Sequence, residues 1–199
     1  MKKWLCLALA LGAALALGSV SRAQTAGLEA HGLFAFGFDG TAKDRGDDDI
    51  ANAFGFGGGM VFCLGEYVKV DVGGDWVKTK DEDLDNSKIT LIPVTAALRV
   101  GGHLDMVYAY VGGGAGYSFN SFNATSAVKS YFGSDVKLKD APIYFALAGA
   151  EIGLSEQLVL RGEFRYNWLN PDLELTDYDY KTNVNLDHMQ LRVGFGLYF

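Results

Sequence analysis

The chain has 199 residues, and its 24 Asp and Glu exceed its 17 Lys and Arg, which gives a formal net charge of −7 at pH 7. An acidic chain without a basic cluster repels nucleic acid phosphates, so nucleic acid is excluded as a partner. The 26 glycines and 13% aromatic residues favour β-sheet over helix, because glycine costs about 1 kcal/mol at each helix position.

The N-terminal segment has the composition of a secretory signal peptide. Two lysines precede an apolar stretch over residues 4–17, and small residues then lead to Ala23. This stretch is shorter than the roughly 20 residues that a membrane-spanning helix needs. We therefore predict that residues 1–23 are a cleaved signal peptide and that residues 24–199 form one β-barrel domain. Cleavage removes three basic residues and leaves 17 − 3 = 14 against 24 acidic ones, a formal charge of 14 − 24 = −10.

After residue 23, apolar and polar side chains alternate in segments of about ten or more residues, which is the period of a β-strand. In chain order, we predict strands over residues 28–38, 53–63, 68–76, 88–100, 106–119, 142–154, 158–168 and 188–199. About eight antiparallel strands fall within the range of transmembrane barrels. The predicted fold is therefore all-β, a closed up-and-down transmembrane β-barrel.

The two faces of these strands differ most clearly over residues 158–168, where the aromatic residues lie on one face and the charged residues on the other. Alternation alone does not say which face meets lipid. The aromatic residues of the apolar face decide it, because they gather near the strand ends as in the two girdles of a membrane barrel. Those near the long connections are Phe38, Trp76, Tyr117, Phe119, Tyr166 and Trp168, and those near the short turns are Phe62 and Phe199.

The opposite face carries the charged residues, which are expected to fill the interior of a narrow barrel. Five acidic and five basic residues form a nearly neutral set that can pair internally. We predict an interior ionic network of Glu29, His31, Lys69, Asp71, Asp75, Arg99, Glu151, Arg161, Glu163, Arg165 and Arg192, accompanied by Gln190.

Long and short connections alternate along the chain. The short ones lie near residues 64–66, 101–105 and 155–157, and the long polar ones span residues 39–52, 80–87, 120–140 and 170–183. In outer-membrane barrels the short turns face the periplasm and the long loops face outside. We therefore predict extracellular loops and periplasmic termini. The acidic clusters in three of the loops lack the spaced ligands of a calcium-binding loop, so we interpret them as solvated and predict no metal site.

The C-terminal end carries Phe199 after Phe195 and Leu197, at two-residue spacing. It resembles the sorting signal of bacterial outer-membrane barrels, which implies recognition by the barrel-assembly machinery. Signal peptide, alternating segments and terminal phenylalanine together resemble the small eight-stranded outer-membrane barrels of the OmpA, OmpX and OmpW types. Residues 92–98 and 108–117 are similar to the middle strands of the OmpW type. The resemblance implies an integral protein of the outer membrane, in contact with lipid and lipopolysaccharide.

An eight-stranded barrel has room inside only for its own side chains or one small ligand. The first interpretation is therefore a non-enzymatic protein with a structural or surface-interaction role through its long loops, and no cofactor is predicted. The alternative, which the OmpW-type similarity implies, is a narrow channel for small hydrophobic solutes. A lateral exit of such a channel needs a break in the strand ladder. Pro93, which lacks a backbone donor, marks either a candidate bulge or an irregular strand end.

A third possibility is an enzyme that modifies lipid A with a His, a Ser and a carboxylate. His31 and His188 are predicted to face the interior, and closure of the barrel between the first and last strands makes them candidate neighbours. Their sequence surroundings do not resemble those enzymes. We therefore interpret them as a buried hydrogen-bonded pair and predict no enzymatic activity.

Overall fold

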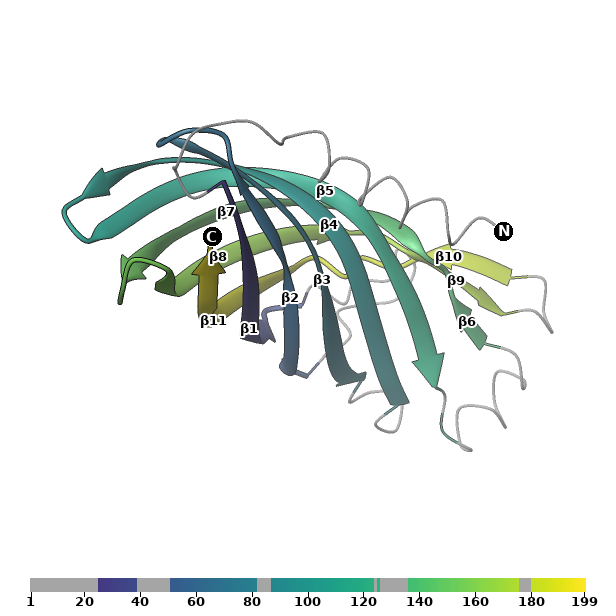
Figure 1. Ribbon diagram of the computed structural model, residues 1–199. Helices are drawn as coiled ribbons and strands as arrows, with labels where there is room; N and C mark the ends of the chain where they lie inside the picture. The colour runs from purple at the N-terminus through teal and green to yellow at the C-terminus, as the bar shows by residue number, and fades with distance from the viewer. Residues whose placement is uncertain (1–24, 39–50, 82–86, 124, 126–135, 176–179) are drawn as a thin grey trace.

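The computed structural model describes residues 25–38, 51–81, 87–123, 125, 136–175 and 180–199. Eight strands close into one antiparallel barrel (Figure 1), in the order β1-β11-β8-β7-β5-β4-β3-β2. Within the described ranges, no helix is long and apolar enough to cross a membrane. The predicted all-β, eight-stranded closed barrel is confirmed. Its strands are β1 (Ala26–Phe36), β2 (Ala53–Cys63), β3 (Val68–Asp81), β4 (Ser87–Leu104), β5 (Val107–Asn123), β7 (Ala141–Gly153), β8 (Leu158–Leu169) and β11 (His188–Tyr198).

Residues 1–23, the predicted signal peptide, lie outside the described residues, as do most of the acidic loop clusters. The domain boundary at residue 24 stays a prediction.

The apolar face of the strands points away from the lumen, the space enclosed by the barrel. Buried and exposed residues alternate along most of β8 and β11. Phe164 of β8 is 42% exposed and Val193 of β11 is 54% exposed, whereas their charged neighbours in sequence are buried. Large apolar side chains exposed in this way on every strand are expected of a surface that meets acyl chains rather than water.

The β4–β5 hairpin is longer than predicted and extends beyond the neighbouring hairpins at the short-turn end (Figure 1). Strand pairing continues to Leu104 and Val107, so the predicted connection over residues 101–105 is wrong. Only Asp105 and Met106 form the turn. Asp105 has a φ of 57°, and a two-residue hairpin turn needs such left-handed geometry, which Asp tolerates better than most residues.

Phe38 does not belong to the outer aromatic girdle, contrary to the prediction. β1 ends at Phe36, and Gly37 follows with a φ of 62°, which breaks the alternation of the strand. The Phe38 ring therefore turns inward and stacks on His188, with 4.6 Å between ring centroids. The other predicted members beside the long loops are partly exposed, from Trp76 and Tyr166 at 37% to Phe119 at 47%.

Two of the predicted polar loops contribute a second, three-stranded sheet at the long-loop end. It has the order β10-β9-β6 and consists of β6 (Val136–Leu138), β9 (Asp172–Leu175) and β10 (Tyr180–Asn183). Leu138 and Leu173 pack against buried apolar residues of the barrel. Strands of three or four residues are too short for alternation to identify them in a sequence.

Glycine makes room inside the barrel for large side chains. Gly149 of β7 lies beside Tyr110, and a Cβ at this position would come within 2.6 Å of the tyrosine hydroxyl oxygen. Gly162, on the neighbouring strand but facing outward, has no atom near its virtual Cβ. Glycine at position 149 therefore allows Tyr110 to reach the middle of the lumen.

Candidate functional site

The lower part of the lumen, toward the short turns, is filled by ion pairs centred on Arg99. This residue is fully buried, and its guanidinium donates to Asp71 and, at 2.5 Å, to Glu151. Lys69 donates to the other oxygen of Glu151, also at 2.5 Å. Arg161 donates to Glu29 and lies 3.3 Å from Asp71. Each charge therefore has at least one opposite charge in contact, which offsets the cost of removing it from water.

A second layer lies above the first, toward the long loops. Glu163 accepts from both Arg161 and Arg165. The Asp75 carboxylate accepts from Arg192 and, at 2.9 Å, from Nε2 of His31. The structure thus places all eleven residues of the predicted ionic network inside the barrel. Ten of them are in an ion pair with another member, and His31 is hydrogen-bonded to Asp75.

His31 and His188 are not neighbours, contrary to the expectation. His31 lies opposite Gly194 in the β1–β11 ladder. Nε2 of His188 accepts from the side-chain amide nitrogen of Gln190 at 2.9 Å, and its Nδ1 donates to the Leu186 carbonyl oxygen at 2.8 Å. The side chain of Gln190 in turn accepts from Arg192, the partner of Asp75. The two histidines are therefore the ends of a hydrogen-bonded chain across the lumen.

Three tyrosines complete the network and were not predicted as members. The Tyr110 hydroxyl accepts from Arg161 at 2.9 Å and donates to Glu163 at 3.0 Å. The Lys69 ammonium lies 4.2 Å from the centre of the Tyr108 ring and 4.7 Å from that of Tyr198. In β5 the two tyrosines alternate with other apolar residues, so no contrast in polarity marks the inward face in the sequence.

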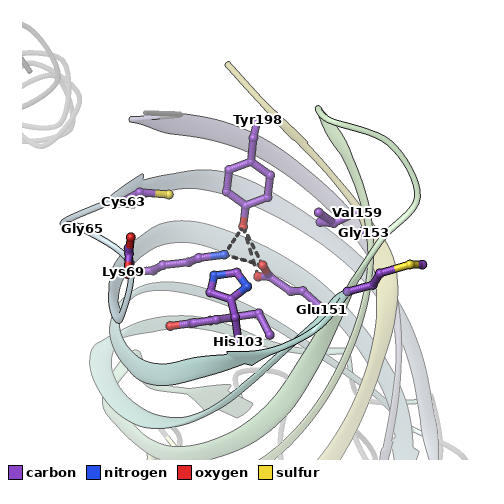
Figure 2. Close-up of a pocket in the computed structure, with 11 residues that line it drawn as sticks. Cys63, Gly65, Lys69, His103, Glu151, Gly153, Val159 and Tyr198 are labelled. Atoms are coloured by element: carbon purple, nitrogen blue, oxygen red, sulfur yellow. Dashed lines mark hydrogen bonds and ion pairs between the residues drawn. The ribbon is translucent and has the colours of Figure 1, made fainter. Parts of the chain in front are cut away.

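A pocket of about 330 Å³ opens on this network at the short-turn end (Figure 2). Lys69, Glu151 and Tyr198 are joined by hydrogen bonds at its centre, and Cys63 and His103 also line it. The network is therefore accessible from this end, but it fills the section of the lumen above the pocket.

The upper part of the lumen, toward the long loops, is mainly apolar, although it also holds the buried polar residues Thr79, Ser87, Ser118, Asn167 and His188. Its buried apolar residues, called the apolar cluster below, are Leu33, Ala35, Ala53, Val77, Ile89, Leu91, Leu138, Ala141, Ile143, Leu169 and Leu186. The sequence analysis predicted an ionic interior and missed this compartment. In the upper half of β1, apolar residues occupy both faces, so alternation of polarity is lost. At the upper ends of β3 and β4 the polarity is reversed, with Lys78 and Lys88 exposed and Val77 and Ile89 buried.

The wall between β3 and β4 has an unpaired stretch beside the apolar cluster. The ladder pairs Gly74 with Val94 and resumes three residues further along each strand, where Val77 pairs with Leu91. Because the register is the same on both sides, Pro93 does not mark a bulge, contrary to the prediction. The four residues between, Asp75 and Trp76 of β3 and Ile92 and Pro93 of β4, are called the β3–β4 gap below.

The cause of the gap is the missing N–H of Pro93. The carbonyl oxygens of Gly74 and Trp76 lie against glycines of β2. Carbonyls alternate in direction along a strand, so the Asp75 carbonyl faces β4. The residue opposite it is Pro93, which has no proton to donate. The preceding and following residues of β4 keep their pairs with β5, so the barrel stays closed on that side.

A closed barrel with an apolar outer surface, outward aromatic residues and an ion-paired lumen defines a transmembrane β-barrel protein. The chain belongs to the outer membrane protein beta-barrel domain family, whose model matches residues 5–199. It is thus an integral protein of the outer membrane, and the predicted membership of the small outer-membrane barrels is confirmed. No curated protein matches the chain.

Several solved barrels share the fold at 16% sequence identity. OprG from Pseudomonas aeruginosa has a TM-score of 0.66, with 88% of this chain and 96% of OprG covered. Neisserial surface protein A has a TM-score of 0.62, with 87% and 97% covered. AlkL, solved in lipid bilayers, has a TM-score of 0.60, with 91% and 93% covered.

The predicted sorting residues Phe195, Leu197 and Phe199 lie on the outer face at the end of the chain, between 48% and 59% exposed. They take no part in the lumen. Recognition by the assembly machinery stays a prediction.

The ionic network should contribute strongly to stability. Arg99→Met leaves Asp71 and Glu151 without their shared buried partner, and we expect the free energy of unfolding to fall by about 3–5 kcal/mol. Urea unfolding of the protein folded in lipid vesicles, followed by the heat-modifiable shift in gel migration, measures this change. Lys181→Met is the control, because Lys181 is 58% exposed in its ion pair with Asp172, and water screens such pairs. Equal loss in both variants would contradict a stabilising role of the network.

Proposed function

We propose that the barrel is a narrow lateral conduit, which takes small apolar solutes from the outer side of the membrane into its hydrocarbon interior. The observation that carries this proposal is the β3–β4 gap beside the apolar cluster, above a lumen filled with ion pairs. The proposal places the long loops outside and both termini in the periplasm. The short β4–β5, β7–β8 and β2–β3 turns, all at the end opposite the long loops, support this orientation.

The chemistry of the route favours lateral exit. Val77 and Leu91, the first pair above the gap, belong to the apolar cluster, whereas Trp76 and Ile92 at the gap face outward. Moving a solute from water into apolar surroundings gains about 25 cal/mol per Å² of apolar surface. At the gap the ladder lacks the hydrogen bond that a residue other than proline at position 93 donates to the Asp75 carbonyl, so fewer bonds hold the wall together here than elsewhere along β3 and β4. Passage straight through the lumen separates buried ion pairs, at about 3–5 kcal/mol for each charge left alone.

A disulfide across the gap tests the lateral exit. In a Cys63→Ala background, Trp76→Cys with Ile92→Cys places two thiols opposite each other on the outer face of β3 and β4. We expect oxidation to lower the uptake of radiolabelled naphthalene by Gram-negative cells that express the protein, and a reductant to restore it.

The matched control is Val70→Cys with Leu98→Cys, a pair on the same face of the same strands within the intact ladder. Its oxidation should leave uptake unchanged, because these strands are already joined there. Uptake that is insensitive to a disulfide at the gap would rule out the lateral exit.

A second candidate function is surface interaction through the β10-β9-β6 sheet. Glu174 lies between Lys137 and Lys181 in the register of this sheet. Lys139 contacts Glu174 at 2.9 Å. The Lys181 ammonium donates to Asp172 and holds the pKa of that carboxyl below its ordinary value. Three exposed lysines on one ordered sheet are suited to phosphate groups, and we propose that they contact the phosphates of lipopolysaccharide.

Charge-matched variants test this contact. Changing Lys137, Lys139 and Lys181 together to Gln should reduce the amount of lipopolysaccharide that stays bound to the purified protein, because the phosphates lose their cationic partners. The triple change to Arg keeps the charge and should retain the wild-type amount. Retention by the Gln variant would refute the proposal.

We propose no catalytic role for the barrel. His31 is engaged with Asp75, and His188 is engaged with Gln190, so both side chains serve the hydrogen-bonded chain across the lumen. His31→Ala and His188→Ala should leave the mass spectrum of the host's lipid A unchanged. A loss of lipid A species in either variant would instead reveal an enzyme.

A further inference from the structure

Arg165 of β8 carries a buried hydrogen-bond donor to which the described residues offer no acceptor. The residue is 3% exposed, and its Nε donates to Glu163. The donor without an acceptor is Nη1 of the same guanidinium. Nη1 lies on the side of the planar guanidinium away from the Nε–H, so it points away from Glu163. Folded proteins contain few buried donors of this kind, because an unsatisfied donor retains the cost of its removal from water.

Arg165 lies at the upper boundary of the ionic network. On β8 the inward residues that follow it toward the long loops are Asn167 and Leu169, and Leu169 belongs to the apolar cluster. The guanidinium lies over the ring of Phe145 of β7, with 4.4 Å between Cζ and the ring centroid. The next inward residue of β7 is Ile143, which is also in the apolar cluster. A solute within the apolar cluster therefore meets Arg165 at the lower end of this compartment.

Arg161, one pair of inward positions further down the same strand, provides a comparison. It is also buried, at 7% exposed. Its Nε donates to Tyr110 at 2.9 Å, its Nη1 donates to Glu29, and its Nη2 donates to Glu163. Arg99 has an unpartnered Nε, but it lies in the lower part of the lumen, away from the apolar cluster. The unused donor at the upper boundary is therefore the one that a solute in the apolar cluster can reach.

The charge balance of the ionic network favours an uncharged partner for this nitrogen. The network has five acids and five bases, and the charge of Arg165 is already paired with Glu163. An anion bound at Nη1 adds an uncompensated charge beside apolar side chains, which is unfavourable. A carbonyl oxygen accepts the same N–H bond and leaves the net charge unchanged.

We propose that Arg165 is a ligand-binding residue of the conduit, and that the solutes it favours are small apolar molecules with one uncharged oxygen acceptor, such as ketones. The inference rests on the proposed conduit and specifies the chemical class of its solutes. The hydrocarbon part of such a molecule packs against the apolar cluster, while its oxygen accepts from Nη1. A hydrocarbon of the same shape is bound less tightly, because it leaves the buried N–H without an acceptor.

Indane and its ketone, indanone, test this recognition, because they share a bicyclic skeleton and differ in the carbonyl group. Each is titrated into the wild-type protein in lipid nanodiscs, and the amide NMR shifts of β8 give the dissociation constants. We expect indanone to bind several-fold more tightly than indane, although the lipid itself favours the more apolar indane. An isotopically labelled carbonyl carbon should shift downfield relative to empty nanodiscs, which reports a hydrogen bond to its oxygen. Indane carboxylate should bind more weakly than indanone.

Arg165→Met removes the donor and keeps an unbranched side chain, and Glu163 retains Arg161 as its partner. We expect this variant to bind indane and indanone with similar affinity and to lose the downfield carbonyl shift. Arg161→Met is the matched control, because it removes a buried guanidinium from the same strand. Each carboxylate paired with Arg161 keeps a second arginine in the control, either Arg165 or Arg99. The control should retain both the preference for indanone and the carbonyl shift.

Equal affinity of the wild type for indane and indanone would overturn the inference, whether or not the variants fold. Retention of the preference by Arg165→Met would do the same, and tighter binding of the carboxylate than of the ketone would overturn the uncharged class. These outcomes are independent of transport. If a disulfide across the β3–β4 gap leaves naphthalene uptake unchanged, the lateral exit is wrong, and the affinities still decide whether Arg165 binds the oxygen. If the disulfide blocks uptake and the affinities are equal, the conduit stands and the role of Arg165 is wrong.

Discussion

A strand that crosses a membrane has to satisfy its backbone and its polar side chains within the protein, because the hydrocarbon interior offers no hydrogen-bond partners. Closure of the barrel between β1 and β11 meets the first demand. The ionic network meets the second, with five acids and five bases that pair across the lumen. These buried charges are stable only when every one of them has a partner of opposite sign. A charge that loses its partner has no contact that offsets the free energy of removing it from water.

This constraint divides the lumen into two parts. In the lower part the charges and tyrosines fill the space, and Lys69, Glu151 and Tyr198 form its boundary toward the pocket at the short turns. In the upper part, apolar residues such as Leu33 and Ile143 pack together, beside buried polar residues such as Thr79 and Asn167. Water and ions have no favourable route through the boundary between these parts, whereas the proposed conduit uses only the mainly apolar part above it.

The sequence predicted those features of the fold that depend on a difference in polarity between residues adjacent in the chain. Arg161, Glu163 and Arg165 alternate with aromatic residues, so both the strand and its faces were evident. Tyr110 and Ala35 have apolar neighbours, and their inward position depends on register, which comes from the paired strands rather than from the segment itself. The contact of His31 with Asp75 depends on tertiary structure, and the inward turn of Phe38 depends on the φ angle of Gly37. The alternation of polar and apolar residues predicts neither of them.

The effect of Pro93 on the barrel wall depends on its residue type, on the register of β3 and β4, and on the side chains packed inside the wall at this point. An unsatisfied carbonyl in a membrane-spanning strand costs several kcal/mol, and any other amino acid at this position supplies the missing donor within an unchanged register. Beside an aqueous lumen, such an opening lets water reach the hydrocarbon of the membrane. In the proposed conduit it joins the apolar cluster to the hydrocarbon of the membrane, with the layer of Asp75, Arg192 and Gln190 directly below. The opening in the wall and the ion-paired layer beneath it are therefore parts of one arrangement, since the first is tolerable in a membrane only where the second excludes water.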